Sequence, residues 1–402
     1  MTAVVGSSMW DDLVGQDHTV AILRAAAAAA YEIAHDRPAP AGAMTHAWLF
    51  TGPPGSGRSV AARALAASLQ CERPDELGCG TCPACRTVRA RTHPDVHSVV
   101  PEGLSIGVAE MRAVVGIAAR RPALGRWQVV VIEDADRLTE QAANALLKAI
   151  EEPPERTVFL LCAPSTHPDD VSLTVRSRCR LVALRTPPAA AVSAVLQRDG
   201  LDPATADWAA AAGQGHIGRS RRLVRDDAAR ARRAEVLAIP ASLTSLRACL
   251  EAADQLVTAA EGEAAGLAGE LDAGETEALQ TALGAGGTGK GAATAARGMA
   301  GALKDLERRQ KSRTTRAQRD ALDRALVDLV AFYRDVLLVQ SGSSVPPAHP
   351  DLADDVRAVA LALGPAGTLR RMNAILACRE ALDLNVKPRI AVEAMTAALR
   401  LP

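Results

Sequence analysis

Aromatic side chains are nearly missing from this chain of 402 residues, of which they make up 2%. A core without many aromatic rings must be built mainly from Ala, Val and Leu, which favours helical packing. Net charge is missing as well, because 46 Lys and Arg residues balance 46 Asp and Glu residues. No overall electric field therefore draws the chain to nucleic acid or to a membrane surface, and any such contact must be local.

Long hydrophobic runs and an export signal are also absent. The most alanine-rich run, at residues 25–30, is bounded by Arg24 and Glu32, so no stretch approaches the roughly 18 apolar residues of a membrane span. A Trp-Asp-Asp sequence at residues 10–12 stands where a signal peptide would have its apolar core. We therefore expect a cytoplasmic protein of two or three domains with no membrane contact.

Short apolar runs alternate with helical patterns between residues 46 and 184, which is typical of a doubly wound α/β layer. The expected strands are Trp48–Thr51, Val96–Val100, Gln128–Ile132, Val158–Cys162 and Leu181–Leu184. The expected helices between them are Ser59–Gln70, Val108–Arg120 and Thr139–Ile150, with Thr139 as the N-cap of the last. After the Thr-Pro-Pro sequence at 186–188, only helical patterns follow.

Three domains are expected from this organisation: an α/β domain at 1–185, a small helical domain at 186–235 and a larger all-helical domain at 236–402. Two breaks interrupt the helical part. Residues 282–301, with five glycines between positions 284 and 291, are expected to form a flexible loop or linker. Residues 341–350 form the second break.

Residues 52–59 read Gly-Pro-Pro-Gly-Ser-Gly-Arg-Ser, after an expected strand and at the start of an expected helix. This is the spacing of the phosphate-binding loop G-x-x-x-x-G-K-[ST], in which backbone N–H groups converge on phosphate oxygens. Its candidate nucleotide-binding residues are Gly52, Gly55, Gly57, Arg58 and Ser59. Arg58 replaces the usual lysine, and a planar guanidinium does not simply take over the role of a slim ammonium. The change favours a loop that no longer binds ATP, although the backbone nest leaves weak binding open. A glycine-rich turn without a ligand is the remaining alternative.

An apolar strand runs into acidic residues at 129–136. In P-loop NTPases the acid at such a strand end, usually Asp, holds Mg²⁺, and a following Glu polarises the attacking water. Here the order is inverted to Glu133 followed by Asp134, which displaces both carboxylates and is costly in rate. Together with Arg58 the inversion predicts loss of hydrolysis, while binding of ATP with Mg²⁺ is left open. Two solvated acids at a strand end are the alternative.

Cys71, Cys79, Cys82 and Cys85 follow the pattern C-x7-C-x2-C-x2-C. In a chain without an export signal, this spacing predicts tetrahedral thiolate coordination of Zn²⁺ rather than disulfides. Four sulfurs fill the coordination shell, so the zinc is expected to be structural. Cysteines elsewhere are expected to be buried apolar residues, and histidines near the cluster are not expected to be ligands: Cys162, Cys179, Cys249 and Cys378, and His46, His93 and His97.

The phosphate loop, the four-cysteine insertion after its helix, and the string Asn-Ala-Leu-Leu-Lys-Ala-Ile-Glu-Glu-Pro-Pro at 144–154 together resemble the AAA+ clamp-loader subunits of bacterial DNA polymerase III. Further matches are Trp-Asp-Asp-Leu-Val-Gly-Gln at 10–16, His-Ala-Trp-Leu-Phe-Thr-Gly at 46–52, His-Pro-Asp at 93–95 and Ser-Arg-Cys at 177–179. Residues 10–220 carry the resemblance. It implies a RecA-like AAA+ domain with a zinc module at 71–85, a small helical lid domain and an all-α C-terminal collar domain that mediates oligomerisation.

Two members of this family compete for the assignment, the ATP-hydrolysing gamma/tau subunit and the non-hydrolysing delta-prime subunit. The hydrolysing pattern has Lys in the loop, Asp-Glu in the acidic turn, and an Arg in the second domain where this chain has Gly218. Arg219, next to it, could compensate. Because all three nucleotide-handling positions depart together, the delta-prime type is favoured, and no ATPase activity of the chain's own is expected.

The Ser-Arg-Cys sequence at 177–179 is intact. The resemblance implies that Arg178 is an arginine finger in the ATP site of a neighbouring subunit, where a guanidinium offsets charge that develops on the γ-phosphate. A surface role for Arg178, and a finger role for Arg176, are the alternatives. The implied function is to help load the sliding clamp onto primed DNA within the DNA polymerase III holoenzyme. The implied partners are the gamma/tau and delta subunits, the clamp and, through the complex, primer-template DNA.

Two other functions remain open. An ATP-driven loader subunit would hydrolyse ATP as a purified protein. A zinc-dependent DNA-binding protein would use the basic stretches Arg219–Arg233 and Lys304–Arg319, but acidic residues interrupt both, as on ordinary solvated helix faces. Binding to bare DNA that weakens steeply with salt would favour the second.

Overall fold

A computed structural model of the chain describes residues 8–282 and 292–400. The chain divides into two compact units, one formed mainly by residues up to 218 and the other mainly by residues from 219 onward. The finer division at residues 185 and 235 stays a prediction. Within the described residues, no helix combines the length and the hydropathy that a membrane span requires.

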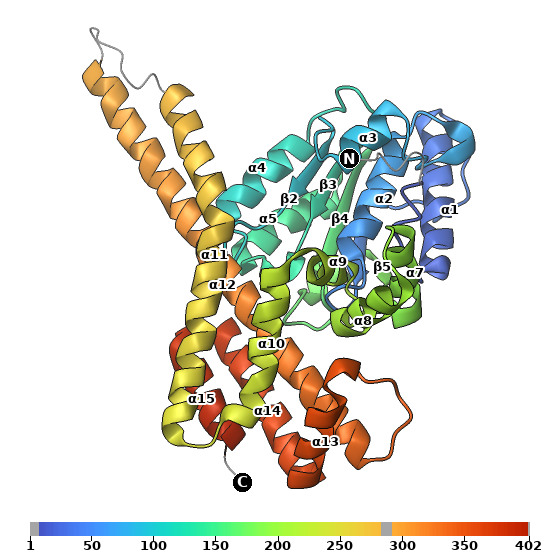
Figure 1. The fold of residues 1–402 in the computed structure, drawn as a ribbon. Coiled ribbons are helices and arrows are strands. Elements are labelled where there is room, and N and C mark those ends of the chain that lie inside the picture. The colour runs from blue at the N-terminus through green and yellow to red at the C-terminus, as the bar shows by residue number, and fades with distance from the viewer. Residues whose placement is uncertain (1–7, 283–291, 401–402) are drawn as a thin grey trace. The chain divides into compact units, whose positions relative to one another are not determined.

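The first unit contains a parallel five-stranded sheet in the order β2-β3-β4-β1-β5 (Figure 1). Its strands are β1 (Ala47–Thr51), β2 (Val96–Val99), β3 (Gln128–Ile132), β4 (Thr157–Ala163) and β5 (Arg180–Ala183). All five strands predicted from the sequence are confirmed, and their ends differ from the prediction by at most one residue. Strands β1, β3 and β4 are buried along their whole length, as is typical of parallel strands with helices on both faces.

The helices up to residue 225 are α1 (Asp17–Ala34), α2 (Arg58–Gln70), α3 (Pro83–Arg89), α4 (Val108–Ala118), α5 (Glu140–Glu151), α6 (Leu173–Arg176), α7 (Ala189–Arg198), α8 (Pro203–Gly213) and α9 (Ile217–Arg225).

Each face of the sheet has its own core, because successive side chains of a strand point to opposite sides. Trp48 and Phe50 of β1 share a core with α1 and α2. Ala47 and Leu49 share the other core with α4 and α5. A doubly wound α/β layer is therefore confirmed.

Thr139 is the N-cap of α5, as the sequence predicts. Its Oγ1 accepts the backbone N–H of Ala142 at 3.3 Å, which satisfies one of the donors left free at a helix start. The helix then buries Leu146 and Ile150 and ends at Glu151. The cap thus fixes the register of the helix that carries Glu151.

The second unit is helical. It contains α10 (Asp227–Ser242), α11 (Leu246–Ala282), α12 (Ala292–Gln340), α13 (Ala353–Ala362), α14 (Pro365–Asp383) and α15 (Pro388–Arg400). The two long helices α11 and α12 lie side by side (Figure 1). Leu322, Phe332, Tyr333 and Ile375 are among the buried residues of a single core.

The breaks predicted in the helical part have different outcomes. The break at 341–350 is confirmed, because α12 ends at Gln340 and the next helical turn starts at Pro350. The loop predicted over 282–301 is wrong for residues 292–301, which belong to α12. That segment is rich in alanine, the strongest helix former, and holds only two glycines. Residues 283–291, with the cluster of glycines, lie outside the described residues.

Candidate functional site

The phosphate loop joins the end of β1 to the start of α2, at the carboxyl edge of the sheet where parallel α/β folds place their ligands. Gly57 is the N-cap of α2 with a φ of 92°, a conformation that favours glycine. At Gly55, a Cβ atom would lie 2.8 Å from the Cβ atom of His216. Only glycine permits this close approach. Gln16 Nε2 holds the loop by donating to the carbonyl oxygens of Ser56 (3.3 Å) and Arg185 (2.5 Å).

A pocket of about 360 Å³ is lined by this loop. The structure brings together in its wall most of the nucleotide-binding residues predicted from the sequence: Gly55, Gly57, Arg58, Ser59 and Glu133. Gly52 and Asp134 are not part of the wall, although Gly52 belongs to the same loop and Asp134 follows Glu133. Whether nucleotide binds in this pocket stays a prediction.

Glu133 is held by two arginines that the sequence analysis did not single out. Its Oε1 atom accepts a hydrogen bond from Arg91 Nη2 at 3.2 Å and lies 3.5 Å from Arg63 Nη1. The Glu133 side chain is only 14% exposed, and both arginines line the pocket. Arg63 follows Ser59 by four residues on one helix, and residues four apart lie on the same helix face. The sequence could therefore have predicted that Arg63 faces the same pocket as Ser59. Nothing in the sequence signals Arg91, because its position depends on how α3 ends.

Gly218 lines the pocket at the position where the hydrolysing relatives are expected to have an arginine. The neighbouring Arg219 is engaged elsewhere, because its guanidinium pairs with the buried carboxylate of Asp328. Arg219 is also not among the residues of the pocket wall. It therefore does not replace the cation missing at position 218.

The four cysteines of the module form one compact cluster. Their sulfur atoms lie within 4.8 Å of one another, and all four residues are buried. Cys71 Sγ is 3.8 Å from Cys79 Sγ and 3.9 Å from Cys82 Sγ. A tetrahedral zinc site with Zn–S bonds of about 2.3 Å places its sulfurs about 3.8 Å apart. The cluster could therefore bind a zinc ion, and no histidine of the described residues belongs to it.

Inside the module the pKa of Cys71 and of Cys79 is lowered, toward the thiolate form that binds metal, whereas the pKa of Cys82 and of Cys85 is raised. The Cys85 thiol, as hydrogen-bond donor, lowers the pKa of Cys71 to about 4, and the same bond raises the pKa of Cys85. The backbone N–H of Cys82 donates to Cys79 Sγ, and that of Cys85 donates to Cys82 Sγ, both at 3.4 Å. The start of α3 thus supplies donors to the sulfur cluster.

The other cysteines lie apart from this module. Cys162, Cys249 and Cys378 are buried, as expected, whereas Cys179, directly before the edge strand β5, is only half-buried. Burial raises the pKa of Cys162 and of Cys179 to about 12. Both are therefore thiols at neutral pH and poor nucleophiles.

Arg178 lies between α6 and β5 and is 38% exposed. Its Nη2 atom lies 2.6 Å from Glu151 Oε1, and its Nη1 atom donates to the carbonyl oxygen of Thr174 at 2.9 Å. The alternative finger, Arg176, donates instead to the carbonyl oxygen of Thr166 at 3.1 Å. A role of either arginine in a neighbouring subunit stays a prediction.

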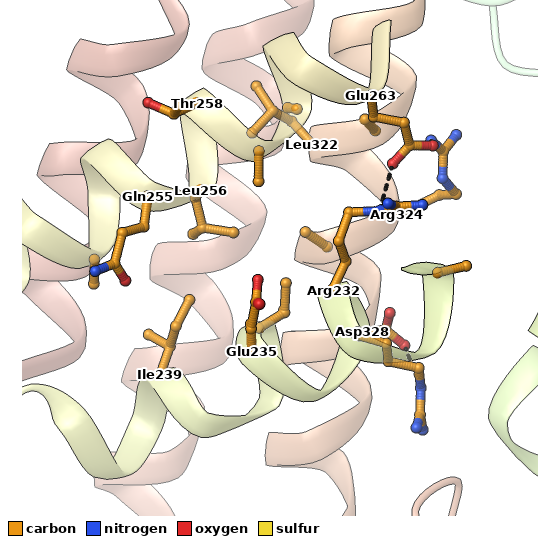
Figure 2. A pocket seen from close by; sticks show the side chains of 18 of the residues that line it. Arg232, Glu235, Ile239, Gln255, Leu256, Thr258, Glu263, Leu322, Arg324 and Asp328 are labelled. Carbon is orange, nitrogen blue, oxygen red and sulfur yellow. Dashed lines mark hydrogen bonds and ion pairs between the residues drawn. The ribbon is translucent and has the colours of Figure 1, made fainter. Parts of the chain in front are cut away.

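A larger cavity, of about 680 Å³, lies among α10, α11 and α12 in the second unit (Figure 2). At one end, three arginines converge on Glu263, which is 10% exposed: Arg222 and Arg324 at 2.6 Å and Arg232 at 3.3 Å. Figure 2 shows Arg324 reaching Glu263 from α12. Burial alone would raise the pKa of Glu263, but the guanidinium groups of Arg324 and Arg222 hold it below its usual range. This end of the cavity is an ion-pair network between helices.

The basic stretch Arg219–Arg233 is largely committed to such pairs. Arginines of this stretch that pair with carboxylates are Arg219, Arg222, Arg230, Arg232 and Arg233. Several of these pairs are partly or wholly buried, so the stretch is not the solvated face that the sequence suggested. Most of its arginines are therefore not free to contact a phosphate backbone.

The fold and the loop define a parallel α/β P-loop protein with a four-cysteine module and a helical C-terminal unit. Residues 33–188 match the family model described as "DNA polymerase III, delta subunit". Over this part, the chain is similar to the clamp-loader subunits of DNA polymerase III.

Two relatives show how far this match extends. The DNA polymerase III subunit delta' of Pseudomonas aeruginosa is 42% identical over 149 residues, which are 36% of this chain and 45% of that protein. The DNA polymerase III subunit gamma/tau of Mycobacterium tuberculosis is 29% identical over an alignment 405 residues long, gaps included, that covers 97% of this chain and 61% of that protein. The chain thus spans less than two thirds of the length of either relative. The higher identity and the wider coverage point to different subunits, so the matches do not separate the two types.

A crystal structure of a gamma subunit-related protein from Thermotoga maritima is similar to the chain with a TM-score of 0.38 and 16% identity. The matched region covers 89% of this chain and 94% of the Thermotoga maritima protein. A likeness of this size does not bear on the fold or the function.

Proposed function

We propose that this chain is the non-hydrolysing delta-prime subunit of the DNA polymerase III clamp loader, which helps to place the sliding clamp on primed DNA. The pairing of Glu133 with Arg63 and Arg91 is the observation that carries this proposal. It removes the carboxylate that a P-loop ATPase needs for its metal ion. Two further features support a non-hydrolysing subunit: Arg58 stands in place of the loop lysine, and a glycine occupies position 218.

In this proposal Arg178 acts on the ATP of a neighbouring subunit. Phosphoryl transfer needs positive charge next to the γ-phosphate as the bond to the leaving group breaks. Arg178 is accessible, and Glu151, the carboxylate with which it pairs, is itself 44% exposed. A guanidinium in this setting can exchange a weak surface pair for a phosphate at little cost.

The remaining parts take supporting roles in this proposal. The four-cysteine module holds a structural zinc ion, because four thiolates leave no open position for a substrate. Residues 1–185 form the AAA+ domain, 186–235 the lid, and the helices from 236 onward the collar that joins the subunit to its neighbours. Its partners are the gamma/tau and delta subunits, the sliding clamp and, through the complex, primer-template DNA.

Reconstitution tests this proposal. The purified chain is mixed with the gamma/tau and delta subunits of the same organism, and complexes are separated by size-exclusion chromatography. We expect one stable complex that loads the clamp onto primed DNA, and much slower loading when the chain is left out. A chain that fails to enter the complex, or whose omission changes nothing, would refute the assignment.

The second candidate is an ATP-hydrolysing gamma/tau-type subunit. The match to the Mycobacterium tuberculosis gamma/tau protein, which covers 97% of this chain, favours it. The two candidates differ in one measurable property, since only the gamma/tau type would hydrolyse ATP with its own loop.

A further inference from the structure

The acidic side of the phosphate-loop pocket does not fit a magnesium ion. In P-loop NTPases the loop Ser or Thr and a strand-end carboxylate hold Mg²⁺. The corresponding residues here, Ser59 and Glu133, both line the pocket. However, the Glu133 carboxylate already lies within 3.5 Å of the guanidinium nitrogens of Arg63 and Arg91. A divalent cation next to Glu133 would meet two positive charges and would have to displace at least one of them.

The same pocket has more positive than negative side chains. Three arginines, Arg58, Arg63 and Arg91, stand in its wall against the carboxylates of Glu133 and Asp12. The Asp12 Oδ2 atom also lies 3.8 Å from the Nη2 atom of Arg89, so this carboxylate is paired with an arginine as well. The Nη1 atom of Arg58 is buried and has no hydrogen-bond partner among the residues that the structure describes. A buried guanidinium nitrogen without an acceptor is costly, and an anion in the pocket would satisfy it.

The position of Arg91 is built into the cysteine module. Arg91 follows α3 with a φ of 60°, which is an uncommon conformation for a residue other than glycine. Its backbone N–H donates to the carbonyl oxygen of Val88 at 3.0 Å, so the end of α3 holds it there. The first residue before α3 is Cys82, one of the four clustered cysteines. The module therefore places a guanidinium next to Glu133.

We propose that this pocket binds a polyphosphate chain without a divalent metal, with Arg63 and Arg91 taking the place that Mg²⁺ holds in P-loop NTPases. This inference rests on the proposed function, because it concerns the nucleotide pocket of a subunit that does not hydrolyse ATP. The loop N–H groups and the three guanidinium groups supply the donors, and the guanidinium is the side chain best matched to phosphate oxygens. The ligand keeps its phosphate bonds, since the two carboxylates of the described pocket wall, Glu133 and Asp12, are already paired with arginines and do not position water.

Calorimetry on the full chain tests the proposal with two probes, inorganic pyrophosphate and ATP, each in EDTA and in excess Mg²⁺. We expect binding in EDTA to be at least as tight as in Mg²⁺, because the metal cancels charge on the ligand without gaining a protein ligand. Tighter binding of ATP than of pyrophosphate would identify a nucleotide as the ligand, and equal binding would identify the polyphosphate alone. Binding that is tenfold tighter in Mg²⁺, or no binding of either probe, would overturn the proposal.

Two variants of equal charge localise the effect. Arg91→Gln is expected to weaken binding in EDTA by about tenfold or more, which corresponds to one or two lost charge-assisted hydrogen bonds. Arg86→Gln removes a positive charge from an exposed position on helix α3, which precedes Arg91, and outside the pocket, so binding should be unchanged. Equal effects of both substitutions would contradict a role of Arg91. A thermal melt of each variant confirms that it is folded.

Loader assembly, measured in parallel, separates this inference from the function on which it rests. A chain that joins the gamma/tau and delta subunits but binds neither probe refutes the inference alone. A chain that binds the probes but never joins them refutes the proposed function alone.

Discussion

Among the individual residues, Arg178 pairs with Glu151 in an exposed ion pair. Pairs of this kind contribute about 0 to 1 kcal/mol, because solvent screens them and both side chains lose freedom. The fold therefore depends little on this contact. A change of loader activity in an Arg178 variant can therefore be attributed to the function of Arg178 rather than to loss of the fold.

We expect Arg178→Ala to leave the chain folded and able to join the loader, while the ATPase and clamp-loading rates of the reconstituted complex fall. Arginine fingers contribute about 10³ to 10⁵ in rate in GTPases. Here the total loss should be smaller, because other ATP sites of the complex continue to work. Arg178→Lys should restore little, since an ammonium lacks the planar fork. The measurement is steady-state ATPase in the presence of DNA and clamp.

Arg176→Ala is the matched control, since Arg176 lies two residues away and contacts a backbone carbonyl instead of a carboxylate. Normal ATPase of the Arg178→Ala complex with normal assembly would show that Arg178 is only a surface residue. A loss confined to Arg176→Ala would assign the finger to that residue instead.

At the scale of elements, the cysteine module links metal binding to the folding of α3. Cys82→Ser should release the metal and lower the melting temperature, because binding energy at such sites is also folding energy. Cys249→Ser is the control, since Cys249 is buried in the core of the helical unit and is not part of the four-cysteine cluster. The readouts are metal content by mass spectrometry and a thermal melt. Protein purified without added chelator that contains no zinc would contradict a structural zinc site.

The break after α12 is held by one buried carboxylate. Asp335 is 1% exposed and accepts the backbone N–H groups of Ala348 (3.0 Å) and His349 (2.9 Å) and, at 3.0 Å, the Nδ1 atom of His349. Burial alone would raise the pKa of Asp335, but the bonds from His349 and Ala348 outweigh it and hold the pKa below its usual value. The carboxylate thus fixes the segment between α12 and α13.

Asp335→Ala should lower the free energy of unfolding by about 2 to 4 kcal/mol, because it leaves three buried donors without an acceptor. Asp305→Ala, at an exposed position of the same helix, should change it by less than about 0.5 kcal/mol. Urea denaturation measures both. Since the folded-state pKa of Asp335 is depressed, its contribution is present above the ordinary aspartate pKa of about 3.9 and declines as the pH falls below that value. Equal stability of the two variants would contradict this account.

How much could be read from the sequence differs from element to element. The strands and the N-cap at Thr139 follow from local patterns, namely apolar runs and a side chain that can cap a helix. The four cysteines also lie close in sequence, so spacing alone predicted their cluster. The contact between Arg91 and Glu133 joins residues 42 positions apart, and no local pattern encodes such a distance. At 292–301, nearby glycines suggested a loop, while the alanines of the segment favoured the helix that forms.

At the scale of the whole molecule, a neutral chain with an altered phosphate loop is expected to show no ATPase activity above background when it is purified alone. The carboxylate required for Mg²⁺ is neutralised by Arg63 and Arg91, and Arg58 takes the position of the phosphate-contacting lysine. Phosphate release is measured at saturating ATP and Mg²⁺, with Ser59→Ala as the control for activity that depends on the loop. Turnover by the chain alone that disappears in Ser59→Ala would refute the non-hydrolysing assignment and favour the gamma/tau type. Turnover that survives in Ser59→Ala would come from a contaminant, since it would not need the loop.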